Sequence, residues 1–416
     1  MKILFVHQNM PGQYKHLLQH YAKQKNVEVA CIGESQNLVK WPGINGVRIH
    51  GYGEVRKAGK QTHPYVRGFE EHVRRGQQVA RAADEIRKSG FEPDVICAHP
   101  GWGEALYLKD IFPDSKLLSF CEFYYNTEGS DVNFDKRGPI TLDKALITRT
   151  RNTTQLLSIA ASDWCISPTE WQMSQYPQMV QNQISVIHDG VDTSVLKPDP
   201  GAYLKMASGA VLKKGDEVIT FVNRNLEPYR GFHVFTQALP LIQKLRPNAH
   251  ILIVGGDGVS YGSHPPPGTT YRKLFMEAVK DKVDMSKIHF LGNLPYPLFV
   301  NVLQISAAHV YLTYPFVLSW SMLEAMSCGC MVVGSRTQPV EEVIKDKENG
   351  LLVDFFDVEG LAHTVDRGLQ DSEENAVIKK NARDTVINKY DLNSVCLPAQ
   401  LKLIDDVCQG KTITVN

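Results

Sequence analysis

Two arginines stand six residues apart where a short apolar strand gives way to a helix. In FVNRNLEPYRGFHVF, residues 221–235, Arg224 ends the strand and Arg230 precedes Gly231 at the start of the helical pattern. Arginine suits the two-pronged hydrogen bonds that phosphate groups accept, so the spacing predicts an anion site. It leaves a second interpretation open, in which the two arginines form surface ion pairs with Glu227 between them.

The following strand ends in a glycine-rich turn. VGGDG contains Gly255, Gly256 and Gly258, where the backbone can approach a ligand closely or simply turn tightly. SYGSHPPPGTT then forms a loop with three prolines before the next helix. A long loop at the carboxyl end of a strand is more often functional than decorative.

A third strand end, YLTYPFVLSWSMLEAMSCGC, leads into a helix for which Ser319 or Ser321 is the expected N-cap. The free amides of its first turn form an anion site with a favourable dipole. Glu324 has two interpretations. It contacts a ligand, or it completes a capping box with Ser321, in which the glutamate only satisfies a backbone N–H.

The N-terminal half also carries ionisable residues after its strands. HQNMPGQYKH can present backbone amides around Gly12, although the dinucleotide-binding pattern G-x-G-x-x-G does not occur there. AHPGWGE places His99 after a second strand, and CEFYYNTEGSDVNFD places Glu122 after a third. His99 is structural in one interpretation and contacts a donor or acceptor in the other.

The elements that position these residues alternate between apolar runs and helical patterns. KILFVH, VEVACIG, DVICAH, LLSFCEF, WCIS and ISVIHDG are expected strands of the first half, and VITFVNR, HILIVGG, KIHFLGN, AHVYLTY, MVVGSR and GLLVDF those of the second. Such alternation predicts mostly parallel sheets covered on both faces. Residues 193–217 are interpreted as a linker. The sequence therefore predicts two doubly wound α/β domains, one on each side of this linker. Ligands are expected to bind beyond the carboxyl ends of the strands, in a cleft between the two domains.

The overall composition limits the classes of partner that the protein is expected to bind. The 416 residues carry 45 basic and 45 acidic side chains, so no overall field attracts nucleic acid. The N-terminal apolar run is too short for a signal peptide, no stretch is long enough to span a membrane, and eight scattered cysteines fit a reduced cytoplasmic protein. Basic residues dominate between Arg56 and Lys88. A solvated helix face is the favoured interpretation, and peripheral contact with anionic lipid at the inner face of the membrane is the alternative.

Several motifs together resemble glycosyltransferase family 4, the retaining, nucleotide-sugar-dependent enzymes of GT-B fold. They are VIHDGVDTSVLKPD, the R-x5-R-G of Arg224 and Arg230, VGGDG, HFLGNL, EAMSCGCMVVGS and EEVIKDKENGLLVD. The resemblance implies two Rossmann-like domains facing across a cleft. Residues 1–195 form the acceptor side, 196–392 the donor side, and 393–416 a C-terminal helix that packs back across the cleft.

The family's site residues carry over by position. Arg224 and Arg230 are expected to bind the donor diphosphate, and Glu324 the ribose. Phe316 stands where the first glutamate of the family's E-x7-E motif would contact the sugar, and Glu122 or His99 is expected to replace a missing N-terminal histidine. The full set of expected donor contacts is Gly12, Gly256, Asp257, Gly292, Asn293, Leu294, Phe316, Val317, Leu318, Ser319 and Glu324.

The function implied is transfer, with retained configuration, from a nucleotide-diphosphate sugar to a glycan, lipid-linked or small-molecule acceptor in surface polysaccharide or glycoconjugate synthesis. No D-x-D occurs, so no essential metal and no cofactor are expected. Positive charge and helix-terminal amides would stabilise the leaving diphosphate, and domain closure would exclude water. Two alternatives stay open: a sugar-nucleotide epimerase that uses acidic residues between Glu122 and Asp135, and a non-catalytic nucleotide-sugar-binding module.

Overall fold

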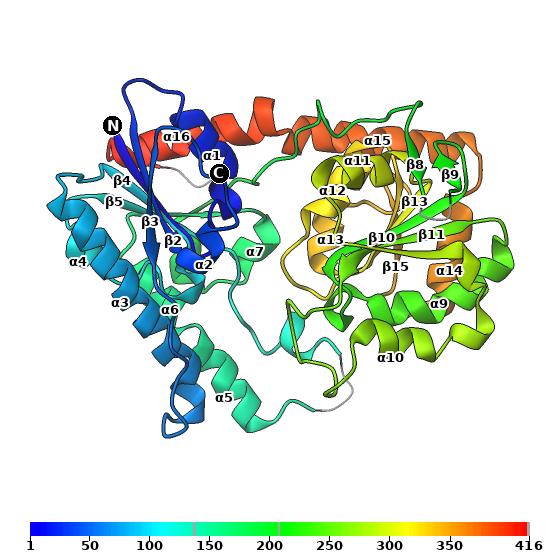
Figure 1. Ribbon diagram of the computed structural model, residues 1–416, viewed down its shortest axis with the longest axis horizontal. Helices are drawn as coiled ribbons and strands as arrows, with labels where there is room; N and C mark the ends of the chain where they lie inside the picture. Colours follow the sequence, from blue (N-terminus) through cyan, green and yellow to red (C-terminus); the bar gives the residue numbers. More distant parts are fainter. Residues whose placement is uncertain (136–138, 207–208, 414–416) are drawn as a thin grey trace. The chain divides into compact units, whose positions relative to one another are not determined.

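The computed structural model describes residues 1–135, 139–206 and 209–413, and these form two compact units (Figure 1). Unit 1 comprises Met1–Asp189 together with the chain from Cys396 onward, and unit 2 comprises Gly190–Val395. Each unit is built on one parallel sheet. The two expected α/β domains are therefore present, and the expected packing of the C-terminal helix across a cleft stays a prediction.

The sheet of unit 1 has seven strands in the order β3-β2-β1-β4-β5-β6-β7. Their bounds are β1 (Lys2–Val6), β2 (Glu28–Glu34), β3 (Val47–Tyr52), β4 (Val95–Ala98), β5 (Lys116–Phe120), β6 (Trp164–Ser167) and β7 (Ile184–Val186). The order reverses between β1 and β4. In open parallel sheets, ligands bind at the carboxyl ends of the strands at such a reversal, which singles out the residues that directly follow β1 and β4.

Helices cover both faces of this sheet. They are α1 (Lys15–Tyr21), α2 (Ser35–Leu38), α3 (Arg67–Lys88), α4 (Leu108–Ile111), α5 (Leu142–Arg151), α6 (Thr153–Ala160), α7 (Glu170–Ser174), α8 (Gln178–Gln181) and α16 (Leu397–Cys408). Alternate residues of β1 point to opposite faces. Ile3 and Phe5 pack in one cluster with residues of α1 and α16, and Leu4 and Val6 in another with residues of α3. Figure 1 shows α1 and α16 on one face and α3 on the other.

Unit 2 repeats this design with six strands in the order β12-β11-β10-β13-β14-β15. They are β10 (Val218–Asn225), β11 (His250–Gly256), β12 (Ile288–Gly292), β13 (Ala308–Tyr311), β14 (Met331–Ser335) and β15 (Leu351–Val353). Its helices are α9 (Phe232–Leu245), α10 (Tyr271–Glu277), α11 (Tyr296–Ile305), α12 (Trp320–Ser327), α13 (Gln338–Val343), α14 (Val358–Gly368) and α15 (Glu373–Tyr390). Here the order reverses between β10 and β13.

The interpretation of residues 193–217 as a linker is wrong. This segment contains a two-stranded antiparallel sheet, formed by β8 (Tyr203–Lys205) and β9 (Val211–Lys213). Residues 207 and 208 of the segment lie outside the described part of the chain. Leu204 and Leu212, the central residues of the two strands, are buried in the core of unit 2. Each strand offers one apolar side chain between polar or exposed neighbours, so the pattern was too short to predict a strand.

The described part of the chain contains no helix that is long and apolar enough to cross a membrane.

Candidate active site

The arginine pair lies at the reversal point of unit 2, and its two members have different environments. Arg224 at the end of β10 is exposed, whereas Arg230 is only 5% exposed. Nη1 of Arg230 donates to Thr313 Oγ1 at 2.7 Å and to the carbonyl of Val317 at 2.9 Å. Arg230 therefore fixes the loop that follows β13, while Arg224 presents its charge to solvent.

The turn between these arginines depends on a glycine. Pro228–Arg230 form a 3₁₀ turn, and Gly231 follows with φ of 70° at the N-cap of α9. A Cβ at position 231 would lie 2.3 Å from Leu312 Cβ, a distance that carbon atoms do not tolerate. Glycine permits both the left-handed backbone and the close approach of the two loops.

Glu227 connects the arginine turn to the proline-rich loop. Its side chain is fully buried, and Oε2 accepts hydrogen bonds from the backbone N–H groups of Ser260 and Tyr261, both at 2.9 Å. Burial raises the pKa of this carboxyl group, and these two bonds and the nearby arginines act against that rise. The sequence offered Glu227 only as an ion-pair partner, because a contact 33 residues away leaves no local pattern.

Aromatic rings surround the Arg230 guanidinium. Its central carbon lies 5.2 Å from the Tyr261 ring centroid and 5.9 Å from that of Phe316, within range of cation–π attraction. The Tyr261 and Phe316 centroids are 4.8 Å apart, and Tyr229 stacks on Tyr314 at 4.8 Å. Phe316 is thus a buried member of an aromatic cluster at the position where the resemblance led us to look for a glutamate.

The glycine turn after β11 is held by Asn225, the residue that follows Arg224. Asn225 Oδ1 accepts from the N–H of Gly258 at 3.2 Å, and its Nδ2 donates to Ser260 Oγ at 2.8 Å. Asp257 forms an ion pair with Arg272 at 2.6 Å. Asn225 was not singled out from the sequence, although its place directly after Arg224 was a usable signal.

Helix α12 begins directly after the loop that Arg230 holds. Ser319 is its N-cap and accepts from the N–H of Ser321, while its own N–H donates to the Tyr311 hydroxyl at 2.7 Å. Ser321 lies inside the helix, so the capping box of Ser321 with Glu324 is wrong. Glu324 Oε1 instead accepts from the Tyr296 hydroxyl at 3.2 Å.

The other expected donor contacts of unit 2 follow strands or precede this helix. Leu318 is buried, Val317 is half-buried, and Gly292, Asn293 and Leu294 come directly at or after the end of the edge strand β12.

In unit 1, two histidines follow the strands at the reversal point. His7 comes directly after β1 and His99 directly after β4, and their ring centroids are 5.2 Å apart. His99 stacks on Trp102 at 4.4 Å, and its Nδ1 accepts from the N–H of Gly101 at 3.1 Å. Burial, and next the proximity of His99, lower the pKa of His7. His7 was missed, although it is the last residue of the first expected strand, KILFVH.

Glu122 is brought to this pair from β5. Its Oε2 lies 3.4 Å from His99 Nε2, and its Oε1 accepts from Gln13 Nε2 at 3.2 Å. Gln172 of α7 donates to the Glu122 carbonyl at 2.5 Å. The side chain of Glu122 is 29% exposed and that of His99 only 3%, so Glu122 stands at the surface with His99 behind it.

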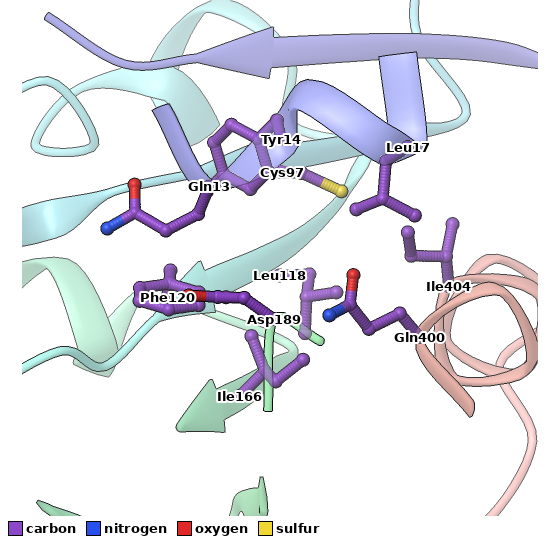
Figure 2. Close-up of a pocket in the computed structure, with 10 residues that line it drawn as sticks. All are labelled: Gln13, Tyr14, Leu17, Cys97, Leu118, Phe120, Ile166, Asp189, Gln400 and Ile404. Carbon is purple, nitrogen blue, oxygen red and sulfur yellow. The ribbon is translucent and has the colours of Figure 1, made fainter. Parts of the chain in front are cut away.

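Gly12 and Gln13 connect this cluster to the interior. A Cβ on Gly12 would lie 2.8 Å from the His7 ring, which explains the glycine. Gln13 also lines a cavity of about 20 Å³, whose other lining residues include Tyr14, Leu118, Asp189 and Gln400 (Figure 2). This volume suits a single water molecule.

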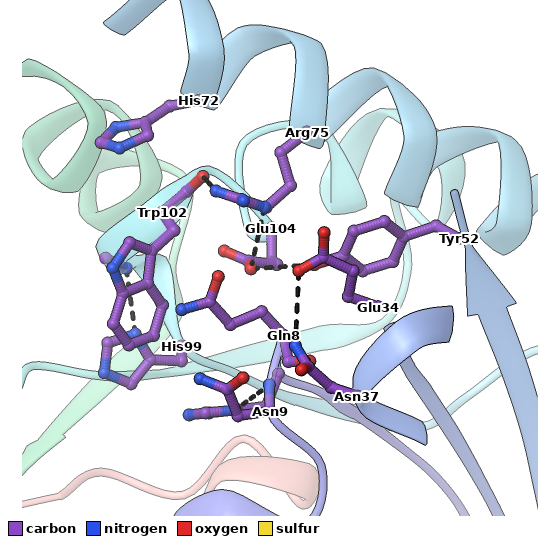
Figure 3. Close-up of polar contacts among 12 residues, drawn as sticks. Gln8, Asn9, Glu34, Asn37, Tyr52, His72, Arg75, His99, Trp102 and Glu104 are labelled. Atoms are coloured by element: carbon purple, nitrogen blue, oxygen red, sulfur yellow. Dashed lines mark hydrogen bonds and ion pairs between the residues drawn. The ribbon is translucent and has the colours of Figure 1, made fainter. Parts of the chain in front are cut away.

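A buried ion pair lies near His99 (Figure 3). Glu104 is fully buried, accepts from the Tyr52 hydroxyl at 3.2 Å and lies 3.7 Å from Arg75 Nε. Arg75 also donates to the Trp102 carbonyl at 3.2 Å. Burial raises the pKa of Glu104 and Arg75 opposes it.

This pairing bears on the basic region between Arg56 and Lys88. Arg75 is engaged with Glu104, and Arg74 pairs with Glu70, so both charges are matched inside unit 1. Arg67 and Arg81 are exposed. Contact of this region with a membrane stays a prediction.

Two family models match the chain. Residues 25–196 match the Glycosyl transferase family 4 group, and residues 207–385 match Glycosyl transferases group 1.

Curated relatives match over part of the chain. D-inositol 3-phosphate glycosyltransferase of Mycobacterium sp. (strain KMS) is 26% identical over 186 residues, which cover 44% of this chain and 39% of that protein. Lipopolysaccharide core biosynthesis glycosyltransferase LpsE of Rhizobium meliloti (strain 1021) is 25% identical over 170 residues, covering 40% of this chain and 44% of that protein. The chain thus matches less than half the length of these relatives.

Solved structures match over nearly the whole chain. Sucrose-phosphate synthase from Thermosynechococcus elongatus superimposes with a TM-score of 0.72 at 17% identity, covering 99% of this chain and 100% of that one. Anabaena HepE in complex with UDP superimposes with a TM-score of 0.68 at 15% identity, covering 97% and 99%. At these identities the likeness concerns the fold, and it confirms the expected GT-B class.

Proposed function

Because the chain belongs to the group 1 glycosyl transferases, with a family 4 region ahead of the group 1 region, we propose that it transfers a sugar from a nucleoside diphosphate sugar to an acceptor. The observation that carries this proposal is the arginine turn of unit 2. The exposed charge of Arg224, the buried charge of Arg230 and the first turn of α12 all lie at the carboxyl ends of β10 and β13. Such groups suit the diphosphate of a donor.

In the proposed reaction, the bond between the anomeric carbon and the diphosphate oxygen breaks, and the electron pair goes to the leaving phosphate. An acceptor hydroxyl forms the new bond to the same carbon, and its proton passes to an oxygen of the leaving diphosphate. Fixed positive charge and helix-terminal amides stabilise negative charge where it develops, without a metal ion. We propose retention of configuration for this transfer.

Unit 1 carries a second, separate set of candidate residues. Glu122 is the accessible carboxylate at the end of β5, and His99 and Gln13 hold it from two sides. A carboxylate held in this way can accept a hydrogen bond from a hydroxyl of the donor sugar or of the acceptor. We assign Glu122 this orienting role, with His99 as the residue that positions it.

Two solved structures of similar fold suggest the first donors to test. The HepE structures are complexes with UDP and with UDP-glucose. Uridine nucleotides are therefore the first probes, followed by GDP-, ADP-, TDP- and CMP-sugars. The proposed acceptor is a glycan, a lipid-linked molecule or a small molecule of surface polysaccharide or glycoconjugate synthesis, and the proposed location is the cytoplasm.

The test compares nucleotide release by the wild type and by Arg224→Ala, with each donor and with crude lipid and glycan acceptors. Loss of one charge-assisted contact costs about 1.5–3 kcal/mol, so donor affinity should fall roughly 10- to 100-fold. Arg367→Ala is the matched control, because Arg367 lies near the end of α14 and pairs there with Glu374. Equal donor affinity in the wild type and Arg224→Ala would contradict the assignment.

The same experiment separates two other functions. Phe316 puts an aromatic ring where a carboxylate was expected, which favours a protein that binds nucleotide sugars without transferring them. Binding without release would support that binding module. Formation of a new nucleotide sugar without any acceptor would support an epimerase.

A further inference from the structure

A groove of about 960 Å³ lies within unit 1, apart from the residues discussed so far. Three segments form its walls: the loop after β5, the consecutive helices α5 and α6, and the chain after α7. Its size is at the upper end of the range typical of ligand sites. The residues that define its chemistry are Tyr124, Tyr125, Asn126, Arg149, Asn152 and Gln175.

The groove is held in a defined shape by its own hydrogen bonds. Asn152, only 1% exposed, accepts from the N–H of Tyr125 at 2.9 Å and donates to the carbonyl of the same residue at 2.8 Å. Asn126 Nδ2 donates to the Gln175 carbonyl at 3.0 Å, which joins the first wall to the third. The Arg151 guanidinium lies 3.7 Å from the Tyr125 ring centroid. Such preorganisation lowers the entropy cost of binding a ligand.

The groove begins next to the candidate active site. Tyr124 follows Glu122 by two residues, so the loop that carries the proposed orienting carboxylate continues directly into the first wall. On α7, Gln172 donates to the Glu122 carbonyl, and the groove is lined from Ser174 onward. A ligand with one end at Glu122 can therefore extend along the groove.

The lining favours a carbohydrate. Tyr124 and Tyr125 add aromatic ring surface with a hydroxyl at one end, although the Arg151 guanidinium covers one face of the Tyr125 ring. The amides of Asn126 and Gln175 both donate and accept hydrogen bonds. Threonine and serine hydroxyls from all three walls add neutral groups, and none of the described residues that line the groove is acidic. A chain of sugars has the matching surface, because each residue has an apolar C–H face edged by hydroxyl groups.

We propose that this groove binds the sugar residues that precede the reacting end of an oligosaccharide acceptor. The proposal rests on the proposed transferase function and deepens it, because it makes the acceptor a chain of sugars rather than a small molecule. Its terminal residue lies at Glu122, and the next residues lie along Tyr124, Tyr125 and Gln175.

The test measures binding to an array of oligosaccharides of one to six residues, built from glucose, galactose, mannose or N-acetylglucosamine. We expect affinity for at least one series to rise with chain length. Tyr125→Ala should abolish this rise, with a loss of at least about tenfold for the longer chains, whereas Tyr125→Phe should keep most of it. Tyr203→Ala is the matched control, since Tyr203 is an exposed tyrosine of unit 2. Thermal unfolding of each variant shows whether unit 1 still folds.

Three results would overturn the proposal: affinity that does not rise beyond one sugar, length dependence that survives in Tyr125→Ala, or no binding to any series. Flotation with phosphatidylglycerol vesicles that is lost in Tyr125→Ala, without glycan binding, would assign the groove to a membrane surface and also overturn it. Donor binding to unit 2 is measured separately. If unit 2 binds no donor while glycan binding still increases with chain length, the proposed transferase function is wrong, but the groove is still a glycan-binding site.

Discussion

Replacing Glu227 by alanine tests whether the arginine turn holds the proline-rich loop in place. The substitution removes the oxygen that accepts from the N–H groups of Ser260 and Tyr261. A hydrogen bond to a charged group contributes about 1.5–3 kcal/mol. Both donors are half-buried, so water can replace part of each bond. We therefore expect the free energy of unfolding to fall by about 2–4 kcal/mol.

The assay is thermal unfolding combined with donor binding. For a unit of this size, 1 kcal/mol shifts the midpoint by about 2–4 °C, so Glu227→Ala should unfold roughly 4–16 °C below the wild type. Donor affinity should fall as well, because Tyr261 loses its fixed place over the Arg230 guanidinium. Glu227→Gln keeps an acceptor oxygen and should lose less than half as much stability.

Glu277→Ala is the control, because its carboxylate is 70% exposed and pairs with Lys280 in the next turn of the chain. The reasoning fails if Glu227→Ala unfolds within about 1 °C of the wild type. It also fails if the glutamine variant is as unstable as the alanine variant, since the loss would then come from the charge and not from the two bonds.

Further predictions concern the arginine turn and two buried ionisable groups. Arg230→Lys keeps the charge but cannot reproduce the forked hydrogen bonds, so calorimetry should show donor affinity reduced about tenfold, and unchanged affinity would refute this. Gly231→Ala forces a Cβ against Leu312 in a left-handed backbone and should lower the free energy of unfolding in urea by about 2–5 kcal/mol. Burial lowers the pKa of His309 to about 3, below an ordinary value of about 6.5, so folding stability should be lost as the pH falls from about 6.5 towards 3. His309→Gln should flatten that loss in acid titrations followed by circular dichroism. The raised pKa of Glu104 makes stability change with pH in the opposite direction. The wild type should lose stability relative to Glu104→Gln as the pH rises above about 4.5.

The central strands of both units could be predicted because they are short apolar runs buried on both faces. β3 was not predicted, since its sequence VRIHGY alternates polar and apolar residues at the edge of the sheet. The same limitation hid β8 and β9. The local pattern therefore identified the central strands and the residues at or after their ends, which is why Arg224, His99 and Glu122 were singled out as candidates.

The contacts that connect these residues could not be predicted in the same way. Glu227 meets the backbone 33 residues further on, and Glu104 meets Tyr52 across 52 residues. Such pairs are set by how loops meet at the end of a sheet and leave no periodic signal in the chain. Phe316 could be identified as unexpected from its position alone, but the rings around it come from separate loops.

Unit 1 is built from the two ends of this sequence, and this affects how it folds during synthesis. Leu403, Ile404 and Val407 of α16 complete the apolar cluster that contains Ile3 and Phe5. At about 5–20 residues per second, the ribosome needs on the order of 10–40 s to add the roughly 200 residues that separate Asp189 from α16. Throughout this interval that face of the first sheet is covered by α1 but lacks the apolar side chains of α16, while the whole of unit 2 is synthesised. The half of the protein that is made first can therefore complete its core only after the second half has been synthesised.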